Sequence, residues 1–351
     1  MAENNPIFNP DDVGVDNGAY FGFPFTEEQA RLVVVSVPWD VTVSYGAGTA
    51  YAPDALIEAS TQLDFCDPIA LDIWREGIAT AGIDYSLHEL SQRLRTDAER
   101  VIRHLEDGGK TSDDSVVRKI RRVNEGCQKM NEAVEKQCMA QLAKGKIVGL
   151  VGGDHSTPYG LIKALGRCHD KFGVLHIDAH CDLRNAYEGF EFSHASIMYN
   201  VLRDVPAVER IVEVGVRDFC RAEYDLAHSS QRVAMFDDGT ISRRRFEGMS
   251  WREQCQEMIE HLPEKVYVSF DIDGLSPELC PHTGTPVPGG LSFNEAIYLV
   301  NAIAESGRTI IGFDVVEVVP DMKERTDAIV GARVLWKLCC LALKSQTPKG
   351  E

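Results

Sequence analysis

The second half of the chain alternates short apolar segments with segments of helical length, and this alternation constrains the fold most. The apolar segments read KIVGLVGG, FGVLHIDAH, RIVEVGVR, KVYVSFDID and TIIGFDVVEV. Short runs rich in β-branched residues, separated by helical stretches, are typical of parallel strands buried on both faces. The sequence therefore predicts a three-layer α/β/α sandwich with a mainly parallel central sheet.

The first half of the chain predicts one more strand and three helices. The segment RLVVVSVPW, residues 31–39, has strand character, and a helix is expected to start near Pro53 after a glycine-bearing loop. Two long amphipathic helices are expected from about Glu89 to Gly145, with a break at EDGGKTSDDS. The polar, Gly- and Pro-containing start predicts an N-terminal arm over residues 1–30, followed by a single α/β domain over residues 31–351.

Charge and cysteine usage narrow the classes of partner and compartment. The chain has 36 basic and 54 acidic residues, a formal net charge of −18. This charge repels nucleic acid and anionic membranes and favours a cationic ligand, with an adaptation for solubility as the alternative interpretation. The segment MAENNPIFNPDD lacks the basic and apolar regions of a secretory signal, and no apolar run approaches the roughly 20 residues that span a bilayer. The ten scattered cysteines form no C-x-x-C pair, which indicates a reduced, cytoplasmic setting.

Polar residues directly follow four of the predicted strands. The strand ends carry the sequences GGDH, DAHCD and DID, and a glutamate. Because ligands of parallel sheets bind beyond the carboxyl ends of the strands, we expect these residues to form one site. The candidate residues are His155, Asp178, His180, Asp182, Asp271, Asp273 and Glu317.

The spacing within DAHCD suggests which side chains act together. In an extended chain alternate residues face the same way, so Asp178, His180 and Asp182 would share a face and Cys181 would pack on the other. His176 has the same parity but lies deeper in its strand, so we expect it to be buried and hydrogen-bonded rather than a ligand. Acids on a surface loop are the alternative interpretation, which fits poorly with the apolar strands that they adjoin.

Buried carboxylates need partners, and a pair of divalent metal ions would supply them. The four aspartates balance two such ions, and His155 and His180 each add a neutral nitrogen. Carboxylate and imidazole without thiolate suit Mn²⁺, Ni²⁺, Fe²⁺ or Co²⁺ better than a structural zinc. Two adjacent metals lower the pKa of a shared water, so the sequence predicts a metal-dependent hydrolase with two ions per chain, Ni²⁺ or Mn²⁺.

The motifs GGDHS, DAHCD, SFDIDGLSP, TGTPVPGG and DVVEVVP together resemble the arginase/agmatinase (ureohydrolase) family, in order from about Leu32 to Arg333. The resemblance implies the same three-layer fold and assembly as a homotrimer or homohexamer. It also implies that one metal is held by His155, Asp178, Asp182 and Asp271, and the other by His180, Asp178, Asp271 and Asp273.

The resemblance further implies three catalytic residues. Asp182 would accept a hydrogen bond from the bridging hydroxide, His194 in FSHASIM would shuttle protons, and Glu317 would bind the guanidinium group. These roles agree with the chemistry, since a guanidinium needs a carboxylate to hold it and its leaving amine needs a proton donor. A purely structural His194 is the alternative.

Arg184 departs from the arginase pattern, in which an asparagine contacts the substrate's amino-acid end. A cation here would repel the amine of arginine or agmatine. It would instead receive the carboxylate of a guanidino acid, cap a small pocket, or point into solvent.

The segments VGVDNGAYFGFPFT and SVPWDVTVSYGAGTAYAPDALIEASTQLD resemble the branch of the family that contains nickel-dependent guanidine hydrolases. The aromatic residues of these segments either close over a very small substrate or pack the arm onto the core. They are Tyr20, Phe21, Phe23, Phe25, Trp39 and Tyr45. We therefore expect a small cationic guanidino substrate, namely free guanidine. Agmatine or a guanidino acid is the alternative substrate. More remote alternatives are a formimino substrate such as formiminoglutamate, or a non-catalytic sensor. The resemblance to this branch also implies accessory proteins that load the metal.

Overall fold

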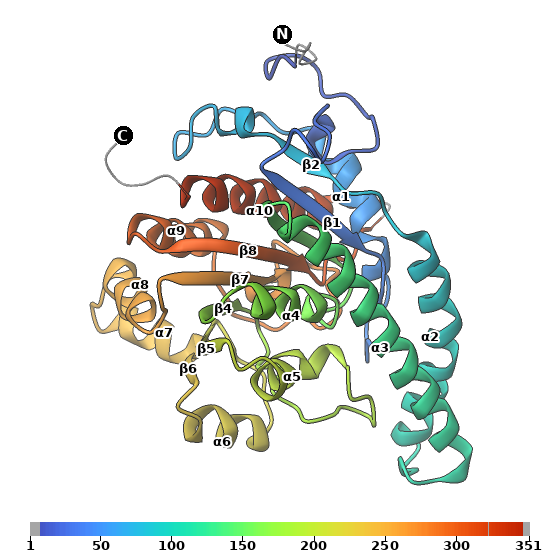
Figure 1. Cartoon of the computed structure of the whole chain (residues 1–351). Coiled ribbons are helices and arrows are strands. Elements are labelled where there is room, and N and C mark those ends of the chain that lie inside the picture. The colour runs from blue at the N-terminus through green and yellow to red at the C-terminus, as the bar shows by residue number, and fades with distance from the viewer. Residues whose placement is uncertain (1–7, 322, 347–351) are drawn as a thin grey trace.

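The computed structural model describes residues 8–321 and 323–346 (Figure 1). Residues 1–7 of the predicted arm, residue 322, and the last five residues of the predicted domain lie outside this range. In the described residues eight strands form one sheet, and every strand pair is parallel. The strands are β1 (Leu32–Val37), β2 (Ile78–Thr80), β3 (Ile147–Gly152), β4 (Phe172–Ile177), β5 (Val208–Val214), β6 (Val233–Phe236), β7 (Lys265–Asp271) and β8 (Thr309–Val316).

Helices cover both faces of the sheet, which confirms the predicted three-layer α/β/α architecture. One apolar core lies between the sheet and α1, α7, α8, α9 and α10, and a second lies between the opposite face and α2 to α6. The helices are α1 (Ala52–Ser60), α2 (Tyr85–Glu106), α3 (Asp114–Leu142), α4 (Tyr159–Cys168), α5 (Ile197–Asp204), α6 (Arg221–Ser229), α7 (Asp238–Phe246), α8 (Trp251–Glu260), α9 (Phe293–Glu305) and α10 (Thr326–Lys344).

The strand order is β2-β1-β3-β8-β7-β4-β5-β6. The four strands whose ends carry the candidate residues, β3, β8, β7 and β4, are therefore consecutive in the centre of the sheet. This order confirms that their polar ends meet at one edge. β2 and β6 lie at the two margins and were not predicted, because runs of three and four residues carry little pattern.

The two long helices form a hairpin that extends well beyond one end of the sheet (Figure 1). α2 starts at Tyr85, earlier than the predicted Glu89, because the side chain of Asp84 accepts a hydrogen bond from the backbone N–H of Ser86. The predicted break lies between Glu106 and Asp114, where the first helix ends and the second begins. No helix in the described part of the chain is long and apolar enough to cross a membrane.

The aromatic residues of the arm pack mainly onto the core. Phe21 and Phe23 are buried against α10 and the loop before β2, with ring centroids 5.3 Å from Trp336 for Phe21 and 4.8 Å from Phe65 for Phe23. The hydroxyl of Tyr20 lies 2.8 Å from that of Ser36. This confirms the packing interpretation for these residues. The same holds for Trp39, which is fully buried, whereas Tyr45 is 84% exposed.

Candidate metal centre

The side chain of His155, just beyond β3, faces three carboxylates. Its Nδ1 atom lies 2.9 Å from Oδ2 of Asp178, 3.2 Å from Oδ2 of Asp182 and 3.2 Å from Oδ2 of Asp271. All four side chains are at most 5% exposed. The ends of three strands thus bring one imidazole and three carboxylates to a single point, the first ligand group implied by the resemblance.

A second group lies beside the first and shares Asp178 with it. Nδ1 of His180 lies 3.4 Å from Oδ1 of Asp178 and 3.2 Å from Oδ2 of Asp273. Asp178 therefore presents one carboxylate oxygen to each group. Asp271 connects to the second group through its Oδ1, which accepts a hydrogen bond of 2.8 Å from the backbone N–H of Asp273. The structure brings all six predicted ligands together.

His176 and Cys181 lie where the sequence predicted. His176 is fully buried, and its Nε2 lies 2.8 Å from Oδ2 of Asp178. His176 is also close enough to His155 and Asp182 to count among the side chains that could hold an ion, yet its contact with Asp178 is the one expected of a residue that orients a ligand. Cys181 is buried in the apolar core between the sheet and α2 to α6, and burial raises the pKa of its thiol.

The hydrogen bonds of His155 indicate that the site fits metal ions. Nε2 lies 2.9 Å from Oγ of Ser269, whose hydroxyl also hydrogen-bonds to the carboxylate of Asp314. An imidazole that donates Nε2–H to Ser269 and binds a cation presents the lone pair of Nδ1 to the three carboxylates. That buried lone pair has no hydrogen-bond donor and faces carboxylate oxygens. A cation between them satisfies both, as in other metal-binding histidines.

The electrostatics of the aspartates support the same conclusion. Burial, followed by the nearby charge of Asp178, raises the pKa of Asp182 to about 6. Burial and the neighbouring Asp273 raise the pKa of Asp271 well above its usual range. Carboxylates crowded in this way bind protons unless cations neutralise them. The residue types and their placement therefore suit a pair of divalent cations.

Two candidate catalytic residues have backbone conformations that are rare outside glycine. The φ angles are +53° for Asp182 and +60° for Glu317. The carbonyl of Asp182 accepts hydrogen bonds from the backbone N–H groups of Met198 and Tyr199, both at 3.1 Å. The surrounding fold thus holds a strained backbone in place, as is common at functional sites.

Glu317 lies at the carboxyl end of β8 and is 7% exposed. Its N–H donates to the carbonyl of Gly153 at 2.9 Å, and its Oε1 accepts from the backbone N–H of His155 at 2.8 Å. Burial, with the nearby Asp154, raises the pKa of Glu317 well above its usual range. A guanidinium cation beside this carboxylate would favour its ionised form, which fits the predicted role.

A cavity of about 160 Å³ lies beside this cluster. Residues that line it include Ser44, His180, Asp182, Arg184, Tyr187 and His194. The carboxyl-bearing residues Asp218 and Glu223 also belong to its wall. Both His180 and Asp182 are candidate metal ligands, so a molecule in the cavity reaches the metal-binding groups directly.

His194 opens the short 3-10 helix His194–Ser196 and lines the cavity. Burial, followed by the charges on His180 and His155, lowers its pKa to about 3. A neutral imidazole at pH 7 is poised first to accept a proton and only then to donate it, which fits a shuttle better than a resting acid.

Arg184 lies in the wall of the cavity, with 36% of its side chain exposed. Its Nε lies 3.5 Å from Oε2 of Glu223, and its guanidinium stacks over the ring of Tyr187 at 4.6 Å. The carboxylate of Glu223 offsets much of the positive charge that Arg184 brings to the cavity. Among the alternatives considered for Arg184, capping the small pocket agrees best with this geometry.

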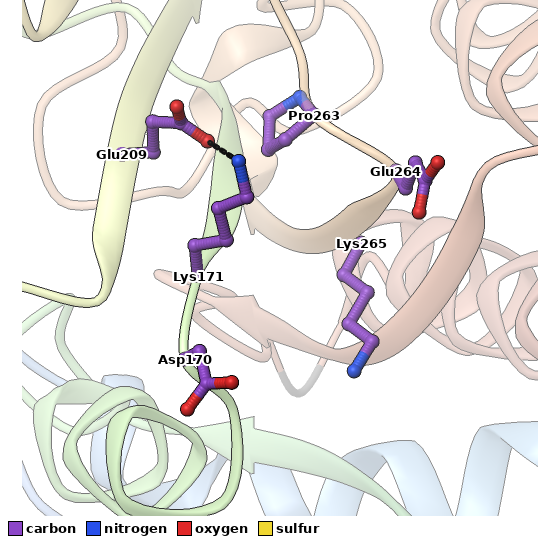
Figure 2. A pocket seen from close by; sticks show the side chains of 6 residues that line it. All are labelled: Asp170, Lys171, Glu209, Pro263, Glu264 and Lys265. Atoms are coloured by element: carbon purple, nitrogen blue, oxygen red, sulfur yellow. Dashed lines mark ion pairs between the residues drawn. The ribbon is translucent and has the colours of Figure 1, made fainter.

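A second hollow, of about 600 Å³, lies at the opposite edge of the sheet, where β4 and β7 begin. Figure 2 shows its charged lining, in which Nζ of Lys171 lies 3.7 Å from Oε2 of Glu209. Lys265 and Asp170 also line this hollow. These groups of mixed sign include no candidate ligand, so the larger hollow is not where the chemistry resides.

Several residues of the site were not predicted from the sequence. Ser269 orients His155, Thr42 contacts His194, and Tyr187 and Glu223 surround Arg184. Ser269 had a signal, because it lies two residues before Asp271 in the same strand and so shares its face. Tyr187 lies in the loop that follows DAHCD, whereas Thr42 and Glu223 come from segments distant in sequence, and no pattern marks any of the three for the site.

The sheet is parallel, helices cover both of its faces, and imidazole and carboxylate groups lie together at the carboxyl ends of its strands. This combination is typical of metal-dependent hydrolases. The sequence matches the Arginase family over residues 30–340. N(1)-aminopropylagmatine ureohydrolase of Thermus thermophilus is 30% identical over 84% of each chain, and an agmatinase of Halalkalibacterium halodurans is 28% identical over 85% of this chain and 88% of its own. The agmatine ureohydrolase of Thermoplasma volcanium shares the fold, with a TM-score of 0.69, 23% identity and 96% coverage of both chains. The chain therefore belongs to the Arginase family and is a ureohydrolase.

Proposed function

We propose that this protein hydrolyses the guanidinium group of a small guanidino amine of the agmatine type and releases urea. The observation that carries the proposal is the convergence of His155 and three aspartates beside the cavity that His194 lines. The names of the relatives support an agmatine-type substrate, since they are agmatinases and aminopropylagmatine ureohydrolases. Asp218 supplies an acidic group to the cavity wall that suits the distal amine.

Free guanidine is the second candidate, although these relatives favour agmatine over this original expectation. Two observations support it. The cavity is only about 160 Å³, and Arg184 lies in its wall, where a cation disfavours a substrate amine. A guanidino acid would use Arg184 as the partner for its carboxylate. Each candidate keeps the same guanidinium site and differs only in what lies at the distal end.

The residues divide the reaction between them. His155, Asp178, His180, Asp182, Asp271 and Asp273 would hold two divalent ions, Mn²⁺ or Ni²⁺, which supply Lewis acidity and a water molecule of lowered pKa when bound. Glu317 holds the planar cation by charge-assisted hydrogen bonds. Asp182 orients the attacking water by accepting its hydrogen bond. His194, neutral at pH 7, takes up a proton and passes it to the leaving nitrogen.

A substrate panel tests the proposal. The protein is prepared separately with Mn²⁺ and with Ni²⁺, and urea is measured from agmatine, N(1)-aminopropylagmatine, guanidine, arginine, guanidinobutyrate and guanidinopropionate. We expect agmatine or its aminopropyl derivative to give the highest kcat/KM. A preference for guanidine would assign the second candidate, formamide from formiminoglutamate would assign the formimino class, and no product with either metal would contradict the proposal.

The proposal extends to the setting of the enzyme. We place it in the cytoplasm as a homotrimer or homohexamer, with accessory proteins for metal loading if Ni²⁺ proves to be the metal. The free state of all ten cysteines supports a reducing compartment. Light scattering of the metal-loaded protein measures the assembly.

A further inference from the structure

We propose that the α2–α3 hairpin positions both loops that form the lips of the active-site cavity, and that Arg95 and Asn124 are its positioning residues. The first lip is residues 40–46, and the second is residues 184–193. The kinetic part of this inference rests on the proposed function, whereas its structural part does not.

The first lip is attached to α2. Nη1 of Arg95 donates to the carbonyl oxygens of Val41, at 3.2 Å, and of Val43. One turn earlier on the same helix, Oγ of Ser91 accepts from the backbone N–H of Asp40 at 3.2 Å and donates to its carboxylate at 3.3 Å. Ser91 and Arg95, spaced i and i+4 on one helix face, thus hold the loop at Asp40, Val41 and Val43.

The residue between the two carbonyls that Arg95 binds is Thr42, and it contacts His194. Oγ1 of Thr42 accepts from the backbone N–H of His194 at 3.2 Å and lies 3.5 Å from Oδ2 of Asp154. Ser44, two residues further on, lines the cavity. Arg95 therefore acts on the candidate proton shuttle through Thr42, without touching the reacting atoms itself.

The second lip is attached to α3. Nδ2 of Asn124 donates to the carbonyl of Gly189 at 3.2 Å, and its Oδ1 accepts from the backbone N–H of Glu191 at 2.9 Å. The side-chain amide of Asn124 thus makes two hydrogen bonds to the backbone of one loop. The loop lies close against the helix, since a Cβ on Gly189 would come within 2.9 Å of Cδ1 of Ile120.

This attachment presents Tyr187 to the cavity. Tyr187 and Phe190 exchange backbone hydrogen bonds of 3.2 and 2.8 Å across a tight turn, in which Glu188 and Gly189 have φ angles of +56° and +85°. The ring of Tyr187 lies edge-on to that of His194, with centroids 6.1 Å apart. Each lip therefore contacts His194, the first through Thr42 and the second through Tyr187.

The two helices are locked to each other next to the residues that hold the lips. A Cβ on Gly126 would lie only 2.1 Å from Cδ1 of Leu94, so the absence of a side chain at Gly126 lets the helices approach. Leu94 adjoins Arg95, and Gly126 lies two residues from Asn124. An ion pair of 3.1 Å between Arg122 and Asp97 also connects the helices. The separation of the lips is thus set by the packing of one hairpin.

The test compares Arg95→Met and Asn124→Ala with two controls on the same helices, Arg93→Met and Gln128→Ala, whose side chains are exposed. Metal content, hydrogen exchange of the metal-loaded protein without substrate, and kcat and KM are measured for each. We expect Arg95→Met to increase exchange in residues 40–46 and 193–195, and Asn124→Ala to increase it in residues 186–192. Both should keep the metal content of the unmodified protein.

The kinetic readout separates positioning from general stability. We expect kcat to fall by about 10- to 100-fold with little change in KM, as for small displacements of catalytic groups. Arg95→Lys and Asn124→Asp, which each keep part of the hydrogen bonding, should recover part of this loss. Unchanged exchange in both lips, an increase spread over the central strands, or kinetics equal to those of the controls would overturn the inference. If the unmodified protein releases no urea, the proposed function fails, and the exchange data still decide whether the hairpin holds the lips.

Discussion

Nε2 of His155 lies 2.9 Å from Oγ of Ser269, and this contact determines which nitrogen of the imidazole faces the aspartates. Ser269 is fully buried on β7. Its contact occupies Nε2, so Nδ1 is the nitrogen that faces Asp178, Asp182 and Asp271. One hydroxyl thus orients the imidazole towards the carboxylates.

Ser269→Ala should weaken metal binding by about 10- to 100-fold, because losing a hydrogen bond behind a histidine ligand typically has this effect. Competition with a chelator measures the affinity. Ser36→Ala is the matched control, since Ser36 is also a buried strand serine but bonds to Tyr20. Equal metal affinity in the two variants would contradict the role of Ser269.

Asp271→Ala should remove metal and activity together. Asp271 faces His155 and also hydrogen-bonds the backbone of Asp273, so its loss disturbs both ligand groups. We expect fewer than two ions per chain by elemental analysis and a loss of activity of at least about 100-fold, more than a residue behind the ligands causes. Asp170→Ala, in the hollow at the opposite edge, should change neither quantity.

Glu317→Gln should keep the metals and raise KM. The amide oxygen of Gln can still accept the N–H of His155, whereas the charge that pairs with a guanidinium is lost. Hydrogen bonds to charged groups contribute about 1.5–3 kcal/mol, so KM should rise by about 10- to 100-fold. Loss of metal from this variant would show that Glu317 supports the metal centre rather than the substrate.

Glu188→Gln should stabilise the protein at alkaline pH. Burial, and then the charge of Glu106, raises the pKa of Glu188 from 4.5 to about 7 in the folded protein. The folded state therefore binds this proton more tightly than the unfolded state. The resulting stabilisation is complete below pH 4.5 and is lost as the pH rises towards 7.

Thermal unfolding at pH 5 and pH 8 tests this prediction. The Gln variant should match the unmodified protein more closely at pH 5 and exceed its Tm by a few degrees at pH 8. Glu191→Gln, an exposed neighbour in the same loop, serves as the control. The same change in Tm at both pH values would mean that ionisation of Glu188 is not the cause.

The sequence was sufficient to predict the central strands of the sheet and the convergence of the candidate ligands at their ends. Long β-branched runs such as that of β8 specify buried parallel strands, and the acids and histidines stand directly at their ends. The parity argument selected residues that the structure brings together, although their local geometry differs from an extended strand. Asp182 has a left-handed backbone, and Asp273 lies in a 3-10 turn that follows β7.

What the sequence did not predict depends on contacts between distant segments. The contact of Arg95 with the lip at Val41 joins residues 54 apart, and that of Asn124 with Gly189 joins residues 65 apart. Neither residue type has a local pattern that marks it for such a role. The ion pair between Arg184 and Glu223 likewise appears only when the chain is folded, and it changes what Arg184 offers a substrate.

Anomalous scattering from crystals of the metal-loaded protein, recorded at the manganese and nickel edges, tests the central claim most directly. We predict two peaks per chain. One should lie between His155 and the carboxylates of Asp178, Asp182 and Asp271, and the other between His180 and Asp273. A catalytically active crystal with no peak at these positions, or with a single peak elsewhere in the chain, would contradict a two-metal ureohydrolase site built from these residues.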